Sequence, residues 1–253
     1  MPTDLSTIQT MMRDPAWSLK NAAESRRWLE AVSKARSTNM VDALRSLVAT
    51  LQPVVEVMPD GWQKGVAQSV EQEALQALAR IGTSGAIACA LERMDAYPGP
   101  AVYALLRHDP RGAYDALSPH FESDGHVVPG PVLDDTLRWL VHGKLPKASR
   151  NDERWLQLAK TLTELLRDPV DRVWGTIPFR GLGLLEMLGG TDAEALIVSL
   201  TGTIGLADLM TPLLSLRTRR AEAHARLVAL EPDFAAHDRE GRSIYEYLLS
   251  ALG

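Results

Sequence analysis

Apolar residues recur along the chain with a period close to that of an α-helix. Between residues 70 and 94, one apolar stripe is formed by Val70, Ala74, Leu78 and Ile81, and a second by Ile87, Leu91 and Met94. Gly82 lies between the stripes, where a helix end favours a residue that tolerates positive φ, and Thr83 or Ser84 can cap the following helix. The pattern therefore predicts a helical hairpin, whose apolar face must be covered by neighbouring elements.

The same periodicity predicts further helices at 25–35, 39–51, 101–107, 111–121, 132–142, 151–167, 204–216 and 219–230. We expect Pro53 to end the helix 39–51, since proline removes a backbone donor. We expect Ile177-Pro178-Phe179 to end a short turn of helix at 170–174. The segment 123–131 contains glycine and two prolines and is expected to be the longest irregular loop.

A second copy of the hairpin pattern occupies residues 184–200. Leu185, Leu188 and Gly189 repeat the spacing of Leu78, Ile81 and Gly82, and the two glycines are separated by about three repeats of roughly 36 residues. The pattern of an apolar helix, an Ile-Gly turn and an Ala-rich helix resembles HEAT-like α-helical repeats of the short bacterial type.

This resemblance implies an all-α fold, an α-solenoid of stacked helical hairpins. We expect one repeat domain over residues 1–253, with an irregular junction at 122–150. An irregular α-helical bundle is the alternative fold. Few alternating runs rich in Val, Ile and Thr are present, which argues against a large sheet.

Composition narrows the classes of partner. The formal net charge is −5 and the sequence pI is about 5.7. A protein that holds a nucleic-acid backbone usually presents a basic surface, so this balance argues against nucleic acid as the partner. No run of apolar residues approaches the length of a membrane span, and we expect no membrane contact and a cytoplasmic location.

The sequence offers little for catalysis or metal binding. It carries no Walker-type phosphate loop, dinucleotide fingerprint, HExxH zinc helix or nucleophile elbow. Cys89 is the only cysteine and is expected to be a small buried residue. His120 and His126, with Asp124 between them and Asp109 and Asp115 upstream, could gather around a metal, but no motif fixes their spacing. We therefore expect no catalytic residue, no metal site and no cofactor.

The candidate binding residues are the polar and aromatic side chains of the second helix in each pair, which in solenoids normally lines the concave face. Arginine and aromatic residues are the usual anchors of such a surface. The candidates are Arg93, Asp95, Tyr97, Tyr114, His120, Arg138, Trp139 and His142.

The predicted function is a non-catalytic protein–protein interaction module, of the inhibitor or immunity type or an assembly adaptor. The acidic balance suits a protein partner with a basic patch. The alternative is an enzyme, a HEAT-like DNA glycosylase or another nucleic-acid enzyme, since glycosylases of this fold line a cleft with Trp, Asp and Arg. A basic groove with an unpaired aspartate beside two tryptophans would favour the enzyme.

Overall fold

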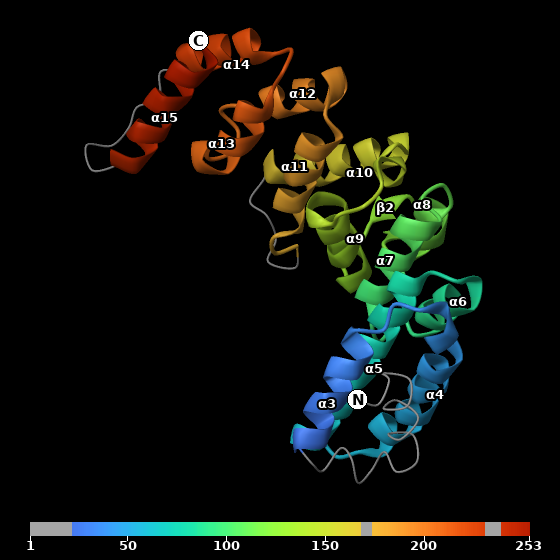
Figure 1. Ribbon diagram of the computed structural model, residues 1–253. Coiled ribbons are helices and arrows are strands. Elements are labelled where there is room, and N and C mark those ends of the chain that lie inside the picture. Colours follow the sequence, from blue (N-terminus) through green and yellow to red (C-terminus); the bar gives the residue numbers. More distant parts are fainter. Residues whose placement is uncertain (1–21, 168–173, 231–238) are drawn as a thin grey trace. The chain divides into compact units, whose positions relative to one another are not determined.

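The structure is a computed structural model that describes residues 22–167, 174–230 and 239–253 (Figure 1). Within these ranges the regular structure is helical, apart from the two-residue strands Glu122–Ser123 (β1) and His126–Val127 (β2). The all-α prediction is confirmed. The chain divides into two compact units, Met1–Asp109 (unit 1) and Pro110–Gly253 (unit 2), which are described separately. The prediction of one repeat domain over residues 1–253 stays a prediction.

Unit 1 is organised around its longest described helix, α5. The helices are α3 (Ala22–Ser33), α4 (Val41–Val57), α5 (Trp62–Ile81), α6 (Ser84–Glu92) and α7 (Pro98–His108), with a 3-10 turn at Thr38–Met40. Each of the other four helices packs against α5, and Figure 1 shows α5 between α3 and α4. This arrangement requires a helix with more than one apolar face.

The sequence of α5 supplies those faces mainly with small residues. Ala67, Ala74, Ala77 and Ala79 are fully buried, and small side chains allow neighbouring helices to approach closely. Larger side chains on α5 and α4 fill the remaining space of the core, namely Val70, Leu75, Leu78, Leu44, Leu47 and Leu51. Burial of a leucine of this kind stabilises the folded state by about 1.5–3 kcal/mol.

The predicted hairpin at the centre of unit 1 is confirmed. Gly82 ends α5 in the left-handed region, with φ of 73°. The side-chain oxygen of Thr83 accepts a hydrogen bond of 3.3 Å from the backbone N–H of Ala86 and so caps α6. Cys89 is buried on α6, as expected for a small core residue.

Unit 2 contains a chain of helices in which each packs on close sequence neighbours. The helices are α8 (Ala113–Leu117), α9 (Pro131–His142), α10 (Glu153–Glu164), α11 (Ile177–Leu188), α12 (Gly190–Ser199), α13 (Leu206–Ser215), α14 (Arg220–Leu230) and α15 (Arg239–Leu252), with 3-10 turns at Ser118–His120, Lys147–Arg150 and Leu165–Arg167. Helix α11 packs on α9 and α10 and also on α12 and α13, while α15 packs on α13 and α14. The predicted second hairpin is present as α11 and α12, joined at Gly189 with φ of 64°.

Two local predictions were wrong. Pro53 lies inside α4, because Leu51 and Val55 continue the same buried face past the proline. Pro178 lies in the first turn of α11, where proline needs no backbone donor, so Ile177 begins a helix. The short helical turn expected at 170–174 lies mostly outside the described residues.

The predicted loop at 123–131 holds a small β-hairpin. Glu122 pairs with Val127 and Ser123 with His126 in antiparallel register. Asp124 and Gly125 form the turn with φ of 51° and 77°, the positive angles that tight hairpin turns require. In the described part of the chain, no helix is long and apolar enough to cross a membrane.

Candidate functional site

A connected polar cluster of unit 2 is built on Tyr114 of α8. The aromatic ring lies 4.7 Å from the ring of Trp155 and 6.1 Å from that of Phe121, measured between centroids, with edge-on geometry in both contacts. Tyr114 is only 8% exposed, while Trp155 is fully buried. The aromatic packing fixes the position of the tyrosine side chain and of the first turn of α10.

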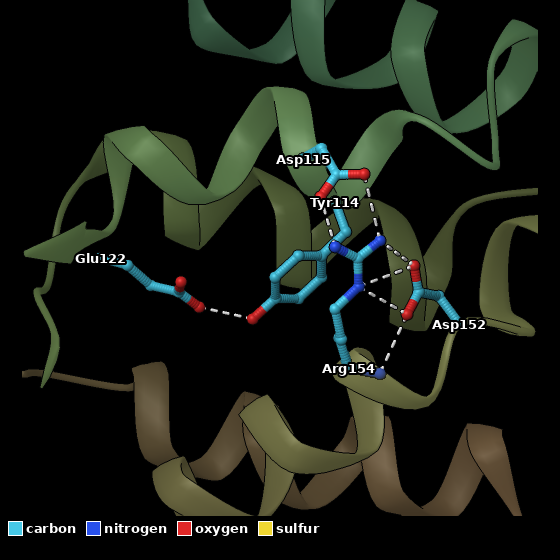
Figure 2. A network of polar contacts seen from close by, with 5 residues as sticks. All are labelled: Tyr114, Asp115, Glu122, Asp152 and Arg154. Carbon is cyan, nitrogen blue, oxygen red and sulfur yellow. Dashed lines mark hydrogen bonds and ion pairs between the residues drawn. The ribbon is translucent and has the colours of Figure 1, made fainter. Parts of the chain in front are cut away.

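Arg154 lies over the outer face of this ring. Its guanidinium carbon is 4.5 Å from the Tyr114 centroid, within the range of a cation–π contact. Arg154 Nη2 lies 2.7 Å from Asp152 Oδ2 and 3.3 Å from Asp115 Oδ2, and Arg154 Nη1 is ion-paired with the other Asp115 oxygen. Figure 2 shows the guanidinium between the two carboxylates. These contacts join α8 to the start of α10.

Local sequence explains why Asp152 points toward the guanidinium. Asp152 caps α10, and its Oδ1 accepts a hydrogen bond of 3.0 Å from the backbone N–H of Arg154. The same carboxylate therefore holds both the backbone and the side chain of Arg154. The hydrogen bond from the guanidinium lowers the pKa of Asp152 below its ordinary value.

The hydroxyl group of Tyr114 completes the cluster. It donates a hydrogen bond to Oε1 of Glu122, at the start of the small hairpin (Figure 2). Burial, together with the hydrogen bond to Glu122, raises the pKa of the Tyr114 phenol above its ordinary value. The five side chains Tyr114, Asp115, Glu122, Asp152 and Arg154 are called the Tyr114–Arg154 network below.

The network presents fixed charges to solvent. The Asp115 side chain is 70% exposed and the Arg154 side chain 43% exposed. The network contains three carboxylates, of which Asp115 and Asp152 flank the guanidinium, and one guanidinium, so it has an excess of negative charge. Every charged group in it has a partner within the network.

The predicted binding residues of unit 1 make internal contacts. Arg93 Nη2 lies 2.8 Å from Oε1 of Glu71, and the Tyr97 hydroxyl donates a 2.8 Å hydrogen bond to the other oxygen of the same carboxylate. The structure thus brings Arg93 and Tyr97 together, and the guanidinium carbon lies 5.9 Å from the centroid of the tyrosine ring. Asp95, by contrast, is exposed.

Two of the predicted binding residues, Tyr114 and His120, lie in α8 and in the 3-10 turn that follows it. Tyr114 is the centre of the network, although its ring is almost fully buried. His120 is exposed at the end of the 3-10 turn that follows α8. Of this predicted pair, only Tyr114 belongs to the network.

Of the three predicted residues of α9, Arg138 belongs to a second ionic cluster. Arg138 is ion-paired with Asp134 at 3.0 Å and with Asp135 at 3.4 Å. Asp134 also forms an ion pair with Arg180 of α11, with 3.0 Å between Oδ1 and Nε, which ties the two helices together. Trp139 is half-buried and His142 is exposed. For all eight predicted residues, a role in binding stays a prediction.

The other four members of the network and the buried Glu71 were not among the predicted binding residues. Asp152 could have been found from its position before the amphipathic helix, where aspartate is a favoured cap. Asp115 and Arg154 meet across a long sequence separation that no local pattern reveals.

No group of three or more His, Cys, Asp and Glu side chains in the described ranges is arranged to hold a metal ion. Comparison of the chain with protein-family models, with curated proteins and with solved structures finds no match.

Proposed function

We propose that the protein is a non-catalytic module that binds another protein, and that the Tyr114–Arg154 network forms part of the contact surface. The observation that carries the proposal is the fixed geometry of exposed charges in this network. Arg154 is held by an aromatic ring and two carboxylates, yet it remains partly exposed.

Fixed side chains favour binding because little conformational entropy is lost when a partner docks. Ordering one flexible side chain at an interface costs about 0.5–1.5 kcal/mol. Arginine and tyrosine are also enriched among the residues that dominate binding energies. The network combines both residue types with their positions already set by the fold.

The charge of the network indicates the chemistry of the partner. Three carboxylates outnumber the single guanidinium, and the whole chain carries a net charge of −5. A protein with a basic patch is the partner that complements this surface. A nucleic-acid backbone, which is itself negative, would be repelled.

We further propose that the helical hairpins stack as a HEAT-like α-solenoid. The support is the equivalent construction of α5–α6 and α11–α12, each joined at a glycine with positive φ. A small acidic repeat protein of this kind suits an inhibitor, an immunity-type protein or an assembly adaptor. A cytoplasmic location accords with Cys89, a buried free thiol.

One observation bears on the enzyme alternative, a HEAT-like glycosylase. Asp135 is half-buried beside Trp139, and burial raises the pKa of its carboxyl group. Asp135 is nevertheless ion-paired with Arg138 of the same helix, whereas the glycosylase interpretation requires an unpaired aspartate. The alternative therefore gains no further support from α9.

The proposal is tested by affinity capture from a lysate of the native host, using three tagged proteins. These are the wild type, Asp115→Lys, and the control Glu164→Lys, which makes the same charge change at an exposed position of α10. Circular dichroism verifies that all three are folded. We expect one protein to be retained by the wild type and by Glu164→Lys, and to be lost with Asp115→Lys. Equal retention by all three, or retention of nucleic acid alone, would contradict the proposal.

A further inference from the structure

Two arginines of unit 1 converge on a single backbone oxygen. Arg36 follows α3 in the sequence, and Arg80 lies in the last turn of α5. The carbonyl oxygen of Ser33 accepts a hydrogen bond of 2.6 Å from Arg36 Nη1 and one of 3.3 Å from Arg80 Nη2. Because both guanidinium groups contact the same atom, the two positive charges are direct neighbours.

Among the described residues, neither guanidinium has a carboxylate partner. The hydrogen bonds of Arg36 go to the carbonyl groups of Ser33 and Ala35, and no ion pair in the described part of the chain involves Arg36 or Arg80. Glu73 attracts the charge of Arg80 but lies outside ion-pair distance. Carbonyl groups at a helix end offset only part of two full positive charges.

Arg80 is the group for which this lack of a counter-charge matters most. It is half-buried, and its Nε atom is shielded from solvent with no hydrogen-bond partner among the described residues. Burial lowers the pKa of the Arg80 guanidinium, and the positive charge of Arg36 lowers it further. Buried charged groups in proteins are normally paired, so this arrangement is characteristic of a site that receives its counter-charge from a ligand.

We propose that Arg36 and Arg80 together bind a phosphate group. A guanidinium presents a planar fork of donors that matches the oxygens of phosphate, and two of them complement a group that carries about −1.5 to −2 charges at pH 7. The site lies in unit 1 and does not rest on the protein-binding function proposed for unit 2.

Isothermal titration calorimetry at constant ionic strength tests the proposal, with inorganic phosphate and N-acetyl-phosphoserine amide as probes and acetate as the control anion. The variants are Arg36→Gln, at an exposed position, and Arg80→Lys, which keeps the charge but removes the planar fork. Arg45→Gln is the matched control, because Arg45 is an exposed arginine of the same unit. Circular dichroism confirms folding of each variant.

We expect millimolar or tighter binding of a phosphate probe to the wild type and to Arg45→Gln, weakened at least about tenfold in Arg36→Gln and Arg80→Lys. If the phosphoserine compound binds more tightly than inorganic phosphate, the ligand of the site is a phosphorylated side chain. If inorganic phosphate binds more tightly, the ligand is the free anion. The proposal is overturned if no phosphate probe binds below about 10 mM, if acetate binds equally well, or if Arg36→Gln binds as the wild type does.

Discussion

Glu71 is fully buried on α5, and its carboxylate forms a 2.8 Å ion pair with Arg93, the residue that ends α6. The Tyr97 hydroxyl donates to the second carboxylate oxygen. Both oxygens of the buried group are therefore satisfied by residues that follow α6. This pair links the central helix of unit 1 to the segment that leads into α7.

Removal of Arg93 is expected to destabilise unit 1 strongly. The Arg93→Met variant keeps most of the side-chain volume but leaves the Glu71 charge with Tyr97 alone. Removing one partner of a buried ion pair lowers the free energy of unfolding by about 3–5 kcal/mol, and we expect the lower end of that range. The free energy of unfolding, measured by urea titration with circular dichroism, reports the loss.

Arg45→Met is the control for this prediction, since Arg45 is exposed on α4 and has no ion pair within the described residues. Its change in stability should stay within about 0.5 kcal/mol. The double variant Glu71→Gln/Arg93→Met should recover part of the loss, because the unpaired charge is removed. Equal effects of Arg93→Met and Arg45→Met would show that the pair does not hold this part of the fold.

Gly82 should not tolerate a side chain. Its φ is 73°, and a Cβ atom would lie 2.2 Å from Cε1 of His108, whose Nε2 is 2.9 Å from the carbonyl oxygen of Ala79. Gly82→Ala therefore strains the backbone and displaces the His108 ring, and we expect a loss of about 2 kcal/mol in stability. Gly65→Ala, at an open position within α5, should instead be neutral or stabilising by up to about 1 kcal/mol. Thermal denaturation compares the two, and equal melting temperatures would contradict the prediction.

Glu194 of α12 holds the segment before α14. Its carboxylate accepts hydrogen bonds from the backbone N–H groups of Arg217, Thr218 and Arg219, at 3.1, 2.8 and 3.0 Å, and from the Thr218 hydroxyl at 2.6 Å. Burial opposes ionisation, but these hydrogen bonds outweigh it and lower the pKa of Glu194 to about 2. The carboxylate is thus a negative cap at the N-terminal end of α14.

The stabilisation from Glu194 should therefore depend on pH. The folded-state pKa lies below the ordinary value of 4.5, so the contribution is complete above pH 4.5 and is lost as the pH falls toward 2. At pH 7 we expect Glu194→Gln to lose about 2 kcal/mol of unfolding free energy, and the difference from the wild type to shrink between pH 4.5 and 2. Urea titrations at several pH values measure this difference.

Glu222→Gln, which removes an exposed ion pair with Arg219, serves as the control and should change stability by less than about 1 kcal/mol. A loss for Glu194→Gln that does not vary with pH would refute the assignment.

The half-buried Tyr97 and the buried Tyr114 should resist ionisation in alkaline solution. Burial, with hydrogen bonds to Glu71 and Glu122, raises the pKa of Tyr97 and of Tyr114 above the ordinary value of 10.0. Because the folded-state pKa is raised, their stabilisation is present below pH 10 and is lost as the pH rises above it. Ultraviolet absorbance of tyrosinate follows the titration, and Tyr114→Phe should remove part of the highest-pH phase. An unchanged high-pH phase in that variant would count against the buried hydrogen bond to Glu122.

The helices could be predicted because their signals are local. The stripe from Val70 to Leu78, the glycine at 82 and the cap at Thr83 all lie within a few turns, and the structure confirms each of them. Pro53 shows the limit of a local rule. The loss of one backbone hydrogen bond is outweighed by continued burial of the same helix face at Val55.

The polar clusters could not be predicted because their partners are distant in sequence. Glu71 reaches Arg93 and Tyr97 across a helix and a turn, and Arg154 reaches Asp115 from another helix. A sequence pattern marks charged residues as exposed by default, so the complete burial of Glu71 gives no advance signal. Tyr114 was identified as a candidate, but the carboxylates that surround Arg154 were not.

The most direct test of the central claim, that the Tyr114–Arg154 network contacts a protein partner, is site-specific photo-crosslinking in host lysate. A benzophenone amino acid replaces Ala116, the exposed neighbour of Asp115 on α8, in one preparation and Glu164, an exposed residue at the end of α10, in the other, so that the network itself stays intact. We predict one protein adduct at position 116 that weakens as the salt concentration rises, and little adduct at position 164. Equal labelling at both positions, or adducts to nucleic acid in place of protein, would contradict it.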